Sequence, residues 1–357
     1  MKIAHVAPIY SPVPPTGYGG VERVVNELLL AQLAFNNLEL LLYAPSDSTV
    51  PLALRSILPS VRSLKDTLSE EELVDWERTY FEFVCRTCSD IDVLHAHGTW
   101  IIPYAHLTGK AVVVSVYTDT SLPQVQETLS KAPGNVFLIA NSQRTRDKFA
   151  TAKWLGTVLE GLCLELYPFE EKKDQDQLVF VGELTPHKGC HLAIQVAREL
   201  GYKLTIIGRS AVLDVPEDIL RKQQDYVTTE IEPYLDERIC YLGEMGEERL
   251  DHIKHACAVL CPISWEEPFG RIMAESMACG TPVIAMRSGA VPEVVLNEVT
   301  GFIVESIEEM KEAVRRVKHI SPADCREHVR VSLNMQRVAK EYVQIYHEIL
   351  EKVTLIS

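Results

Sequence analysis

The sequence predicts an α/β protein built from two doubly wound, Rossmann-like domains. Three observations lead to this expectation: the chain has 357 residues, short apolar runs alternate with helical patterns from end to end, and a polar stretch at 167–177 interrupts the alternation once. That length suffices for two domains of about 100–200 residues each. Alternating strands and helices are typical of a parallel sheet covered by helices on both faces. We therefore expect a first domain at 1–168 and a second at 169–333, facing each other across a cleft.

Five apolar runs in the first half are expected to form the strands of the first domain, because short unbroken apolar runs are typical of strands buried on both faces. They are residues 3–9, 38–43, 93–96, 111–116 and 136–140. Residues 21–35, which follow the first run, repeat apolar side chains at helical spacing. We interpret this helical stripe as core packing rather than as a membrane-inserting face.

The same pattern restarts after the polar stretch, whose acidic part at 174–177 is interpreted as linker. The strands expected for the second domain are residues 178–181, 203–207, 239–242, 258–262 and 282–285. Helical patterns separate them, for example at 191–200 and 247–257. A last amphipathic helix within 334–357 is expected to cross back and join the first domain.

The charge balance argues against several classes of partner. Asp and Glu number 50 against 35 Lys and Arg, a formal net charge of -15. This balance provides no electrostatic footprint for nucleic acid or for an anionic membrane, although a peripheral membrane contact stays open. No apolar stretch reaches the roughly 18 residues of a spanning helix, and no cleavage signal follows the start. We expect a cytoplasmic protein without a transmembrane segment.

The cysteines favour buried thiols over a metal or redox site. Nine cysteines are scattered along the chain, an odd number without a compact framework. Cys85 and Cys88 have metal-ligand spacing but no second pair of ligands, and they end a helix-like run at 71–88. We therefore expect no metal site and no bound cofactor.

A glycine-rich loop at 11–20 joins the first strand to the following helix, and Gly19 and Gly20 close it. Glycine lets the backbone approach a phosphate closely, and a helix start offers unpaired N–H groups. The spacing matches neither of the common phosphate-binding loops. A tight turn that needs a positive φ explains the same glycines, so both interpretations stay open.

The most informative segment runs from Ser264-Trp-Glu-Glu267 to the apolar run at 282–285. It holds two carboxylates, Glu267 before a predicted helix and Glu275 inside it, eight residues apart. Gly270 leaves the start of that helix bare. Carboxylates accept hydrogen bonds from sugar hydroxyls, and N–H groups at a helix start can hold a diphosphate. The pattern suits a phosphorylated polyol, whereas an ordinary solvated helix start is the alternative.

This segment closely resembles the signature of glycosyltransferase family 4. The resemblance extends over nearly the whole chain, at 19–24, 92–97, 140–143, 188–189, 289–294 and 301–304. It implies a GT-B fold and a retaining hexosyltransferase of carbohydrate biosynthesis. Such an enzyme moves a sugar from a UDP-, GDP- or ADP-sugar to a hydroxyl acceptor without a catalytic metal. The partners it implies are therefore a nucleotide sugar and an unidentified acceptor.

Site residues follow from the resemblance, position by position. Glu275 is implied to bind the ribose hydroxyls and Glu267 the transferred sugar. Lys188 is implied to neutralise the diphosphate leaving group, where a charge-assisted contact matters most as the glycosidic bond breaks. Further donor contacts are implied from the backbone of Phe269, Gly270 and Ile272, from the loop at Gly19 and Gly20, and from the segment around Met245.

Two positions depart from the family pattern. Glu183 stands where family members commonly carry an arginine, and a carboxylate beside a phosphate would cost on the order of 4 kcal/mol at an effective dielectric of about 20. Three explanations stay open: Glu183 turns away, with Lys188 or Arg209 as its partner; the diphosphate is neutralised by Arg209 or Arg271; or the donor differs. We favour Arg209.

The second departure follows the run at 111–116, where many members carry a histidine and this chain has Tyr117. Tyr117 can donate a hydrogen bond, and His97 is a candidate to serve in place of the missing histidine. With Glu267, these two residues complete the predicted catalytic set. The two departures also motivate an alternative function, a non-catalytic nucleotide-sugar-binding protein with a degenerate site. A sugar-nucleotide epimerase is a further alternative.

Overall fold

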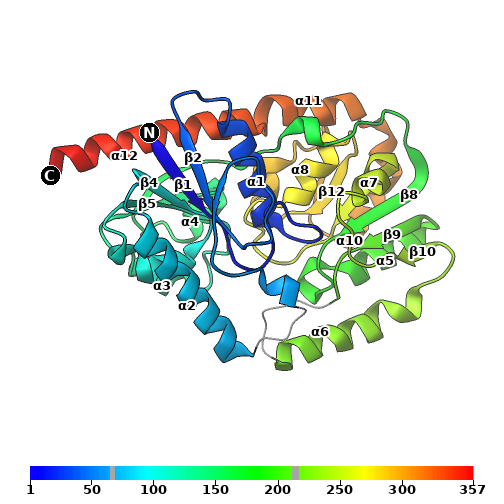
Figure 1. Cartoon of the computed structure of the whole chain (residues 1–357). Helices are drawn as coiled ribbons and strands as arrows, with labels where there is room; N and C mark the ends of the chain where they lie inside the picture. Colours follow the sequence, from blue (N-terminus) through cyan, green and yellow to red (C-terminus); the bar gives the residue numbers. More distant parts are fainter. Residues whose placement is uncertain (65–68, 211–216, 357) are drawn as a thin grey trace. The chain divides into compact units, whose positions relative to one another are not determined.

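The computed structural model describes residues 1–64, 69–210 and 217–356 (Figure 1). The chain forms two compact units. Unit 1 comprises Met1–Gly161 and the C-terminal segment from Met335, and unit 2 comprises Leu162–Asn334. The first junction thus precedes the one expected at residue 168. Residues 162–168 lie with unit 2 because Arg326 donates hydrogen bonds to the backbone oxygens of Leu164 and Tyr167.

Unit 1 contains a seven-stranded parallel sheet in the order β3-β2-β1-β4-β5-β6-β7. Its strands are β1 (Lys2–Val6), β2 (Glu39–Tyr43), β3 (Ala53–Arg55), β4 (Val93–Ala96), β5 (Ala111–Val116), β6 (Val136–Ala140) and β7 (Trp154–Thr157). The order reverses direction between β1 and β4, which is the topological switch point of a doubly wound sheet. The fold class predicted from the alternating pattern is confirmed for this unit. The edge strands β3 and β7 were not predicted.

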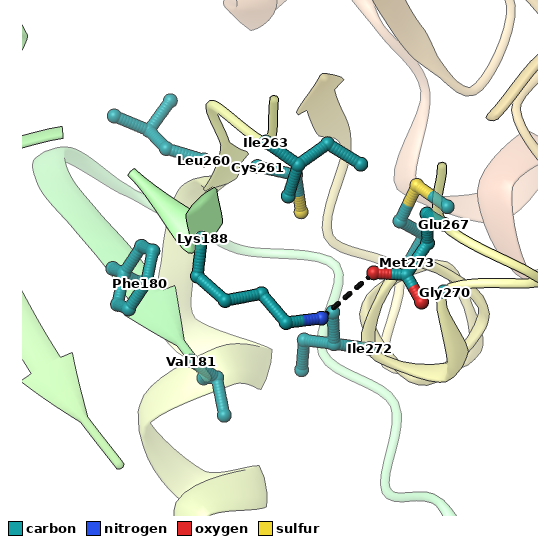
Figure 2. Close-up of a pocket in the computed structure, with 10 residues that line it drawn as sticks. All are labelled: Phe180, Val181, Lys188, Leu260, Cys261, Ile263, Glu267, Gly270, Ile272 and Met273. Atoms are coloured by element: carbon teal, nitrogen blue, oxygen red, sulfur yellow. Dashed lines mark hydrogen bonds and ion pairs between the residues drawn. The ribbon is translucent and has the colours of Figure 1, made fainter. Parts of the chain in front are cut away.

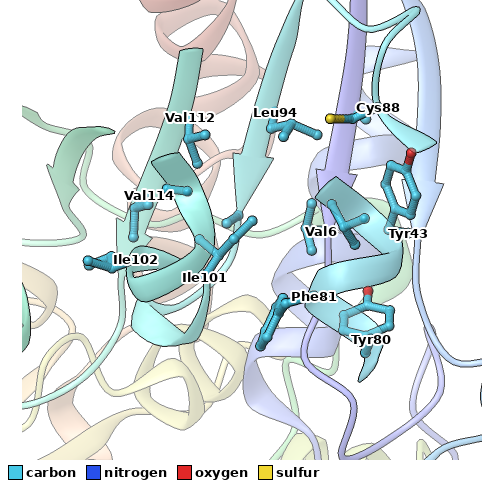
Figure 3. Close-up of a cluster of buried hydrophobic side chains, with 14 of the residues drawn as sticks. Val6, Tyr43, Tyr80, Phe81, Cys88, Leu94, Ile101, Ile102, Val112 and Val114 are labelled. Carbon is cyan, nitrogen blue, oxygen red and sulfur yellow. The ribbon is translucent and has the colours of Figure 1, made fainter. Parts of the chain in front are cut away.

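Helices cover this sheet on both faces. They are α1 (Gly20–Gln32), α2 (Glu70–Thr87), α3 (Pro123–Ser130), α4 (Gln143–Lys148) and α12 (Met335–Ile356), with 3-10 turns at Val61–Leu64 and Thr99–Leu107. On one face, Val6, Leu94 and Val112 pack against Tyr80 and Phe81 of α2 in an apolar cluster (Figure 3). The helices α1 and α12 pack together, and side chains of both reach the other face of the sheet.

Unit 2 contains a six-stranded parallel sheet in the order β10-β9-β8-β11-β12-β13, with its switch point between β8 and β11. Its strands are β8 (Asp174–Val181), β9 (Lys203–Ile207), β10 (Ile239–Tyr241), β11 (Ala256–Cys261), β12 (Val283–Met286) and β13 (Gly301–Val304). The linker predicted at 174–177 is wrong, because these residues begin β8 and Asp174 pairs with Ala256. Their side chains are mostly exposed, so polar residues are tolerated while the backbone pairs.

The helices of unit 2 follow its strands in the chain. They are α5 (Cys190–Leu200), α6 (Glu217–Glu230), α7 (Arg249–His255), α8 (Arg271–Ala278), α9 (Val291–Val294), α10 (Ile307–Arg316) and α11 (Pro322–Ser332). Local signals set several of the ends: α5 lies between Gly189 and Gly201, both with left-handed backbone, and Ser306 caps α10. The helix predicted at 247–257 is shorter, since β11 already begins at Ala256. In the described parts of the chain, every helix is too short or too polar to cross a membrane.

Candidate functional site

A pocket lies at the switch point of the unit 2 sheet, where the ends of β8 and β11 meet the start of α8 (Figure 2). Ligands of open α/β sheets bind in the crevice at such a point. Most of its lining is apolar, and two charged side chains enter it, Lys188 and Glu267. The residues that line it are Phe180, Val181, Lys188, Leu260, Cys261, Ile263, Glu267, Gly270, Ile272 and Met273. Four predicted site residues, 188, 267, 270 and 272, are thus brought together.

Lys188 and Glu267 form an ion pair inside this pocket. The Lys188 Nζ lies 2.8 Å from Glu267 Oε2, and the two side chains are only 17% and 13% exposed. Trp265 takes part as well: its Nε1–H donates to the same Oε2 at 3.0 Å, and Lys188 Nζ lies 4.3 Å from the centre of its indole ring. The pocket therefore holds a neutral pair whose carboxylate accepts two hydrogen bonds.

Two glycines explain the local course of the chain around Glu267. Gly270 has φ +81° at the start of α8, and a Cβ there would lie 2.2 Å from the Met273 side chain. Gly289 has φ +54°, and a Cβ there would lie 2.1 Å from the backbone oxygen of Glu267. That close approach lets Ala290 N–H donate to the same oxygen at 2.8 Å. The position of Glu267 thus depends on both glycines.

Glu275 lies inside α8 and is only 3% exposed. Its Oε2 accepts a hydrogen bond from Arg249 at 2.6 Å, and its Oε1 accepts one from Arg271 at 3.2 Å. Arg249 is buried as well, and Arg271 also donates to the Tyr167 hydroxyl. Glu275 is therefore part of a buried, charge-compensated cluster. Arg249 was not singled out from the sequence.

Glu183 and Arg209 pair with each other at the ends of β8 and β9. Arg209 Nη2 lies 2.8 Å from Glu183 Oε1, and both side chains are 15% exposed. A backbone hydrogen bond from Leu184 N–H to the Arg209 oxygen joins the same two loops. Of the partners considered for Glu183, the structure brings Arg209 to it. Met245 follows β10 and is half-buried, and Phe269 is buried before α8.

Gly19 and Gly20 lie in unit 1, at the start of α1. Gly19 has φ +158°, and a Cβ there would lie 2.7 Å from Pro15, so the loop requires glycine at this position. Gly20 has open space where a Cβ would stand. No side chain caps α1 at this end. The steric requirement therefore explains Gly19 but not Gly20.

His97 and Tyr117 belong to a buried set of side chains that we call the polar network. His97 Nδ1 lies 3.1 Å from the Tyr117 hydroxyl, and His97 Nε2 lies 2.9 Å from His5 Nδ1. His97 is fully buried, whereas Tyr117 is half-buried. The network lies between the sheet of unit 1 and the helices α1 and α12. Its members are His5, Gln32, His95, His97, Ser115, Tyr117, Tyr342 and Tyr346.

The amide of Gln32 sets the direction of hydrogen bonds on one side of the network. Its Oε1 lies 2.8 Å from His5 Nε2, which must therefore donate. His5 Nδ1 then accepts from His97 Nε2, and His97 Nδ1 accepts from the Tyr117 hydroxyl. The Gln32 amide nitrogen donates to Tyr346.

The other side of the network continues in the same direction. The Tyr346 hydroxyl donates to His95 Nδ1 at 2.6 Å, and His95 Nε2 donates to Ser115 at 2.8 Å. Ser115 lies 2.6 Å from the Tyr342 hydroxyl. Every member is satisfied while all three imidazoles stay neutral.

Burial accounts for the neutral imidazoles. It lowers the pKa of His5 to about 4, and it lowers the pKa values of His95 and His97 well below the usual 6.5. Within the described ranges, these are the only three side chains close enough together to hold a metal ion as a group. Each of their ring nitrogens already has a protein partner, so an ion would have to displace hydrogen bonds.

Cys85 and Cys88 lie at the end of α2. Their thiols donate to the backbone oxygens of Tyr104 and Cys85 respectively. Burial raises the pKa of Cys85 to about 11, which opposes formation of the thiolate that metals and disulfide chemistry need. The interpretation as a buried thiol fits Cys88, whereas Cys85 is half-buried.

Two parallel-sheet units, each with its own switch point, define the class of fold, and comparison with solved structures places the chain among the GT-B proteins. A glycosyltransferase involved in avilamycin A biosynthesis, AviGT4, superposes with a TM-score of 0.70 over 98% of both chains at 24% identity. HepE from Anabaena, solved with UDP and glucose, superposes with a TM-score of 0.73 over 98% of this chain and 100% of its own at 17% identity. The GT-B fold predicted from the resemblance is confirmed.

A family model matches the part of the chain that forms unit 2. Residues 167–330 match the model of the family described as glycosyl transferases group 1. Among curated proteins, it is similar to a putative glycosyltransferase, YtcC, of Bacillus subtilis, with 27% identity over 209 residues, or 55% of this chain. The chain spans half or less of the length of the first curated relatives it matches.

Sequence analysis missed three kinds of site residue. Trp265 stands inside the segment that was singled out, so its indole could have been noticed there as a donor beside Glu267. Arg249 is 26 residues from Glu275, and no local pattern links the two. The network tyrosines 342 and 346 are four residues apart on one helix face, and His5 faces the same side of the sheet as His95. That spacing was the available signal.

Proposed function

We propose that the protein is a retaining glycosyltransferase that transfers a sugar from a nucleoside-diphosphate sugar to a hydroxyl acceptor. The observation that supports this most directly is the meeting of Lys188 and Glu267 in a pocket at the switch point of the unit that matches the family. One cation for a phosphate and one carboxylate for sugar hydroxyls are the groups that such a donor requires. A solved relative in fold, HepE, was crystallised with UDP and glucose, which makes UDP-glucose the first donor to try.

In the proposed mechanism, the diphosphate lies at the start of α8 and accepts hydrogen bonds from backbone N–H groups near residues 270–272. Glu267 accepts hydrogen bonds from the hydroxyls of the transferred sugar, and Glu275 accepts hydrogen bonds from the ribose hydroxyls. The bond between the anomeric carbon and the phosphate oxygen breaks, and the acceptor oxygen bonds to the same carbon. The proton of the acceptor passes to the leaving phosphate, whose growing charge Lys188 stabilises.

Charge at the site has to be rearranged for this reaction. Lys188, Arg209, Arg249 and Arg271 are the four cations in the ion pairs described above, against three carboxylates at 183, 267 and 275. Each of these four cations thus already has a carboxylate partner. Donor binding therefore requires Lys188 to exchange Glu267 for phosphate. We propose that Arg209, held by Glu183, supplies the charge that the family arginine usually provides.

On the acceptor side we propose that Tyr117 is the network member that contacts a ligand, because it is half-buried whereas His97 is fully buried. The Tyr117 hydroxyl donates a hydrogen bond to His97, so His97 acts on the reaction through Tyr117. We propose no metal and no bound cofactor for the reaction.

The test is donor binding followed by turnover. UDP, GDP and ADP and their glucose conjugates are screened by thermal shift, since a ligand that binds only the folded state must stabilise it. Release of free nucleotide with a panel of hydroxyl acceptors, with and without EDTA, then tests transfer and metal independence. We expect a shift with one nucleotide and its loss in Lys188→Ala. Absence of any shift from all six compounds would refute the proposal.

The second candidate is a non-catalytic binder of nucleotide sugars, favoured by the carboxylate at 183. Glu183→Arg separates the two. In an active enzyme with Arg209 held by Glu183, the substitution places two arginines side by side and lowers donor affinity. In a degenerate site, the substitution restores the family pattern and raises affinity or activity. Binding of a nucleotide sugar without release of nucleotide from the unsubstituted protein would favour the binder.

A further inference from the structure

Glu267 Oε2 accepts hydrogen bonds from two donors of different kinds. Lys188 Nζ, at 2.8 Å, carries a positive charge, and Trp265 Nε1–H, at 3.0 Å, is neutral. The ammonium also lies against the indole face, 4.3 Å from its centre. The two donors respond differently to a bound anion. A phosphate attracts the ammonium strongly and the indole N–H far less.

Trp265 is held independently of Lys188. Its backbone oxygen accepts hydrogen bonds from Glu267 N–H at 2.9 Å and from the Ser288 hydroxyl. Its indole lies 5.6 Å from the His187 ring, and Ser264 N–H donates to the His187 oxygen at 2.9 Å. Departure of the Lys188 side chain would leave all these contacts in place.

We propose that Trp265 is a positioning residue that keeps Glu267 oriented while Lys188 moves from Glu267 to the diphosphate. The inference rests on the function proposed above, in which both charged residues serve the donor. When Lys188 leaves, a half-buried carboxylate loses its counter-charge, and such a group rotates toward water unless another donor retains it. The indole N–H is that donor. It keeps Oε2 in the pocket, where Glu267 meets the sugar.

Lys188→Met tests this proposal in the absence of a nucleotide sugar, because the substitution removes the ammonium group permanently. The chain has four tryptophans, and the indole N–H signal of Trp265 is identified in a ¹H–¹⁵N spectrum by its disappearance in Trp265→Phe. We expect that signal to stay in its downfield, hydrogen-bonded position in Lys188→Met and to move upfield in Glu267→Ala. An upfield move in Lys188→Met equal to that in Glu267→Ala would overturn the proposal, whether or not the protein binds nucleotide sugars.

Kinetics provide the second measurement. Trp265→Phe retains an aromatic face for Lys188 and loses the N–H. It is expected to leave the affinity for UDP within about two-fold while kcat falls by about ten-fold or more, the usual effect of losing a hydrogen bond to a charged group. Lys188→Ala is the matched control and weakens UDP itself. Equal losses of UDP affinity and kcat in Trp265→Phe would mean that the indole only packs the pocket, and would contradict the proposal.

Discussion

The polar network of unit 1 predicts that the protein loses stability in mild acid. The pKa of His5 is lowered from 6.5 to about 4 by burial, so the unfolded chain binds a proton between these values that the folded chain excludes. Stability is therefore fully present above pH 6.5 and is lost as the pH falls toward 4. At pH 4.5 the loss from this one group is about 2–3 kcal/mol, and the limiting loss below pH 4 is about 3 kcal/mol, from the shift of the pKa between the unfolded and the folded chain.

The pKa values of His95 and His97 are lowered as well. Protonation of either imidazole in acid therefore also lowers the stability of the folded chain. A charged imidazole would also break a hydrogen bond of the network, because it needs two acceptors and each network histidine has one. Even the His5 contribution is a large fraction of the roughly 5–15 kcal/mol by which domains are stable. We expect α12 to loosen with the network, since Tyr342 and Tyr346 anchor it there.

The assay is urea unfolding at pH 7.5 and pH 4.5, followed by circular dichroism. His5→Gln keeps a donor and an acceptor but does not titrate. It is expected to lower the free energy of unfolding at pH 7.5 and to reduce the difference in that free energy between the two pH values by about 2–3 kcal/mol. His106→Gln, at an exposed position, is the matched control and keeps the wild-type difference. An unchanged difference in His5→Gln would refute the reasoning.

Three further predictions concern the donor unit and the glycine loop. Gly270→Ala is expected to lower the free energy of unfolding by about 1–3 kcal/mol, because Gly270 has a positive φ and an added Cβ would meet the Met273 side chain. Gly20→Ala is the control in the same thermal or urea experiment and should be close to neutral, because there is open space at its Cβ. Glu275→Ala should cost about 3–5 kcal/mol in urea unfolding because it leaves Arg249 buried without its carboxylate, and Glu275→Gln should cost less; equal costs would argue against a buried ion pair. Glu183→Gln should weaken UDP binding by up to about ten-fold, measured by calorimetry, because the amide no longer holds its arginine partner through an ion pair. Stronger binding would show that the carboxylate only opposes the phosphate.

The strands that could be predicted share one property. The expected bounds of β4, β5, β6 and β9 agree with the structure because each is a short, mostly apolar run whose side chains are mostly buried, which the pattern of apolar residues reveals. The missed strands β3, β7 and β13 have only three or four residues each. Those of β3 and β7 are largely half-buried and β13 begins with a glycine, so each strand carries little apolar signal. The beginning of β8 was missed for the opposite reason, since backbone pairing there does not depend on its exposed polar side chains.

The site could be predicted only as far as local pattern reaches. Glu267, Gly270 and Glu275 are close in the sequence, and their helix was expected. The partners of the two carboxylates come from other elements: Lys188 is 79 residues away from Glu267, and Arg249 belongs to a different helix from Glu275. Which cation meets which carboxylate is decided by the order of strands in the sheet. Short-range spacing contains no information about that order.

The ion pairs of unit 2 indicate how a protein with a net charge of -15 can bind a charged donor. A free cluster of lysines and arginines would attract many anions, and it would be costly to bury. Here each cation is already paired with a carboxylate. A phosphate that replaces this carboxylate therefore gains only the difference in binding free energy between the two anions. The released Glu267 carboxylate then needs new hydrogen-bond donors. Sugar hydroxyls provide such donors, whereas a simple anion does not. Exchange of partners therefore favours a diphosphate joined to a sugar over a diphosphate alone, and Trp265 retains Glu267 during that exchange.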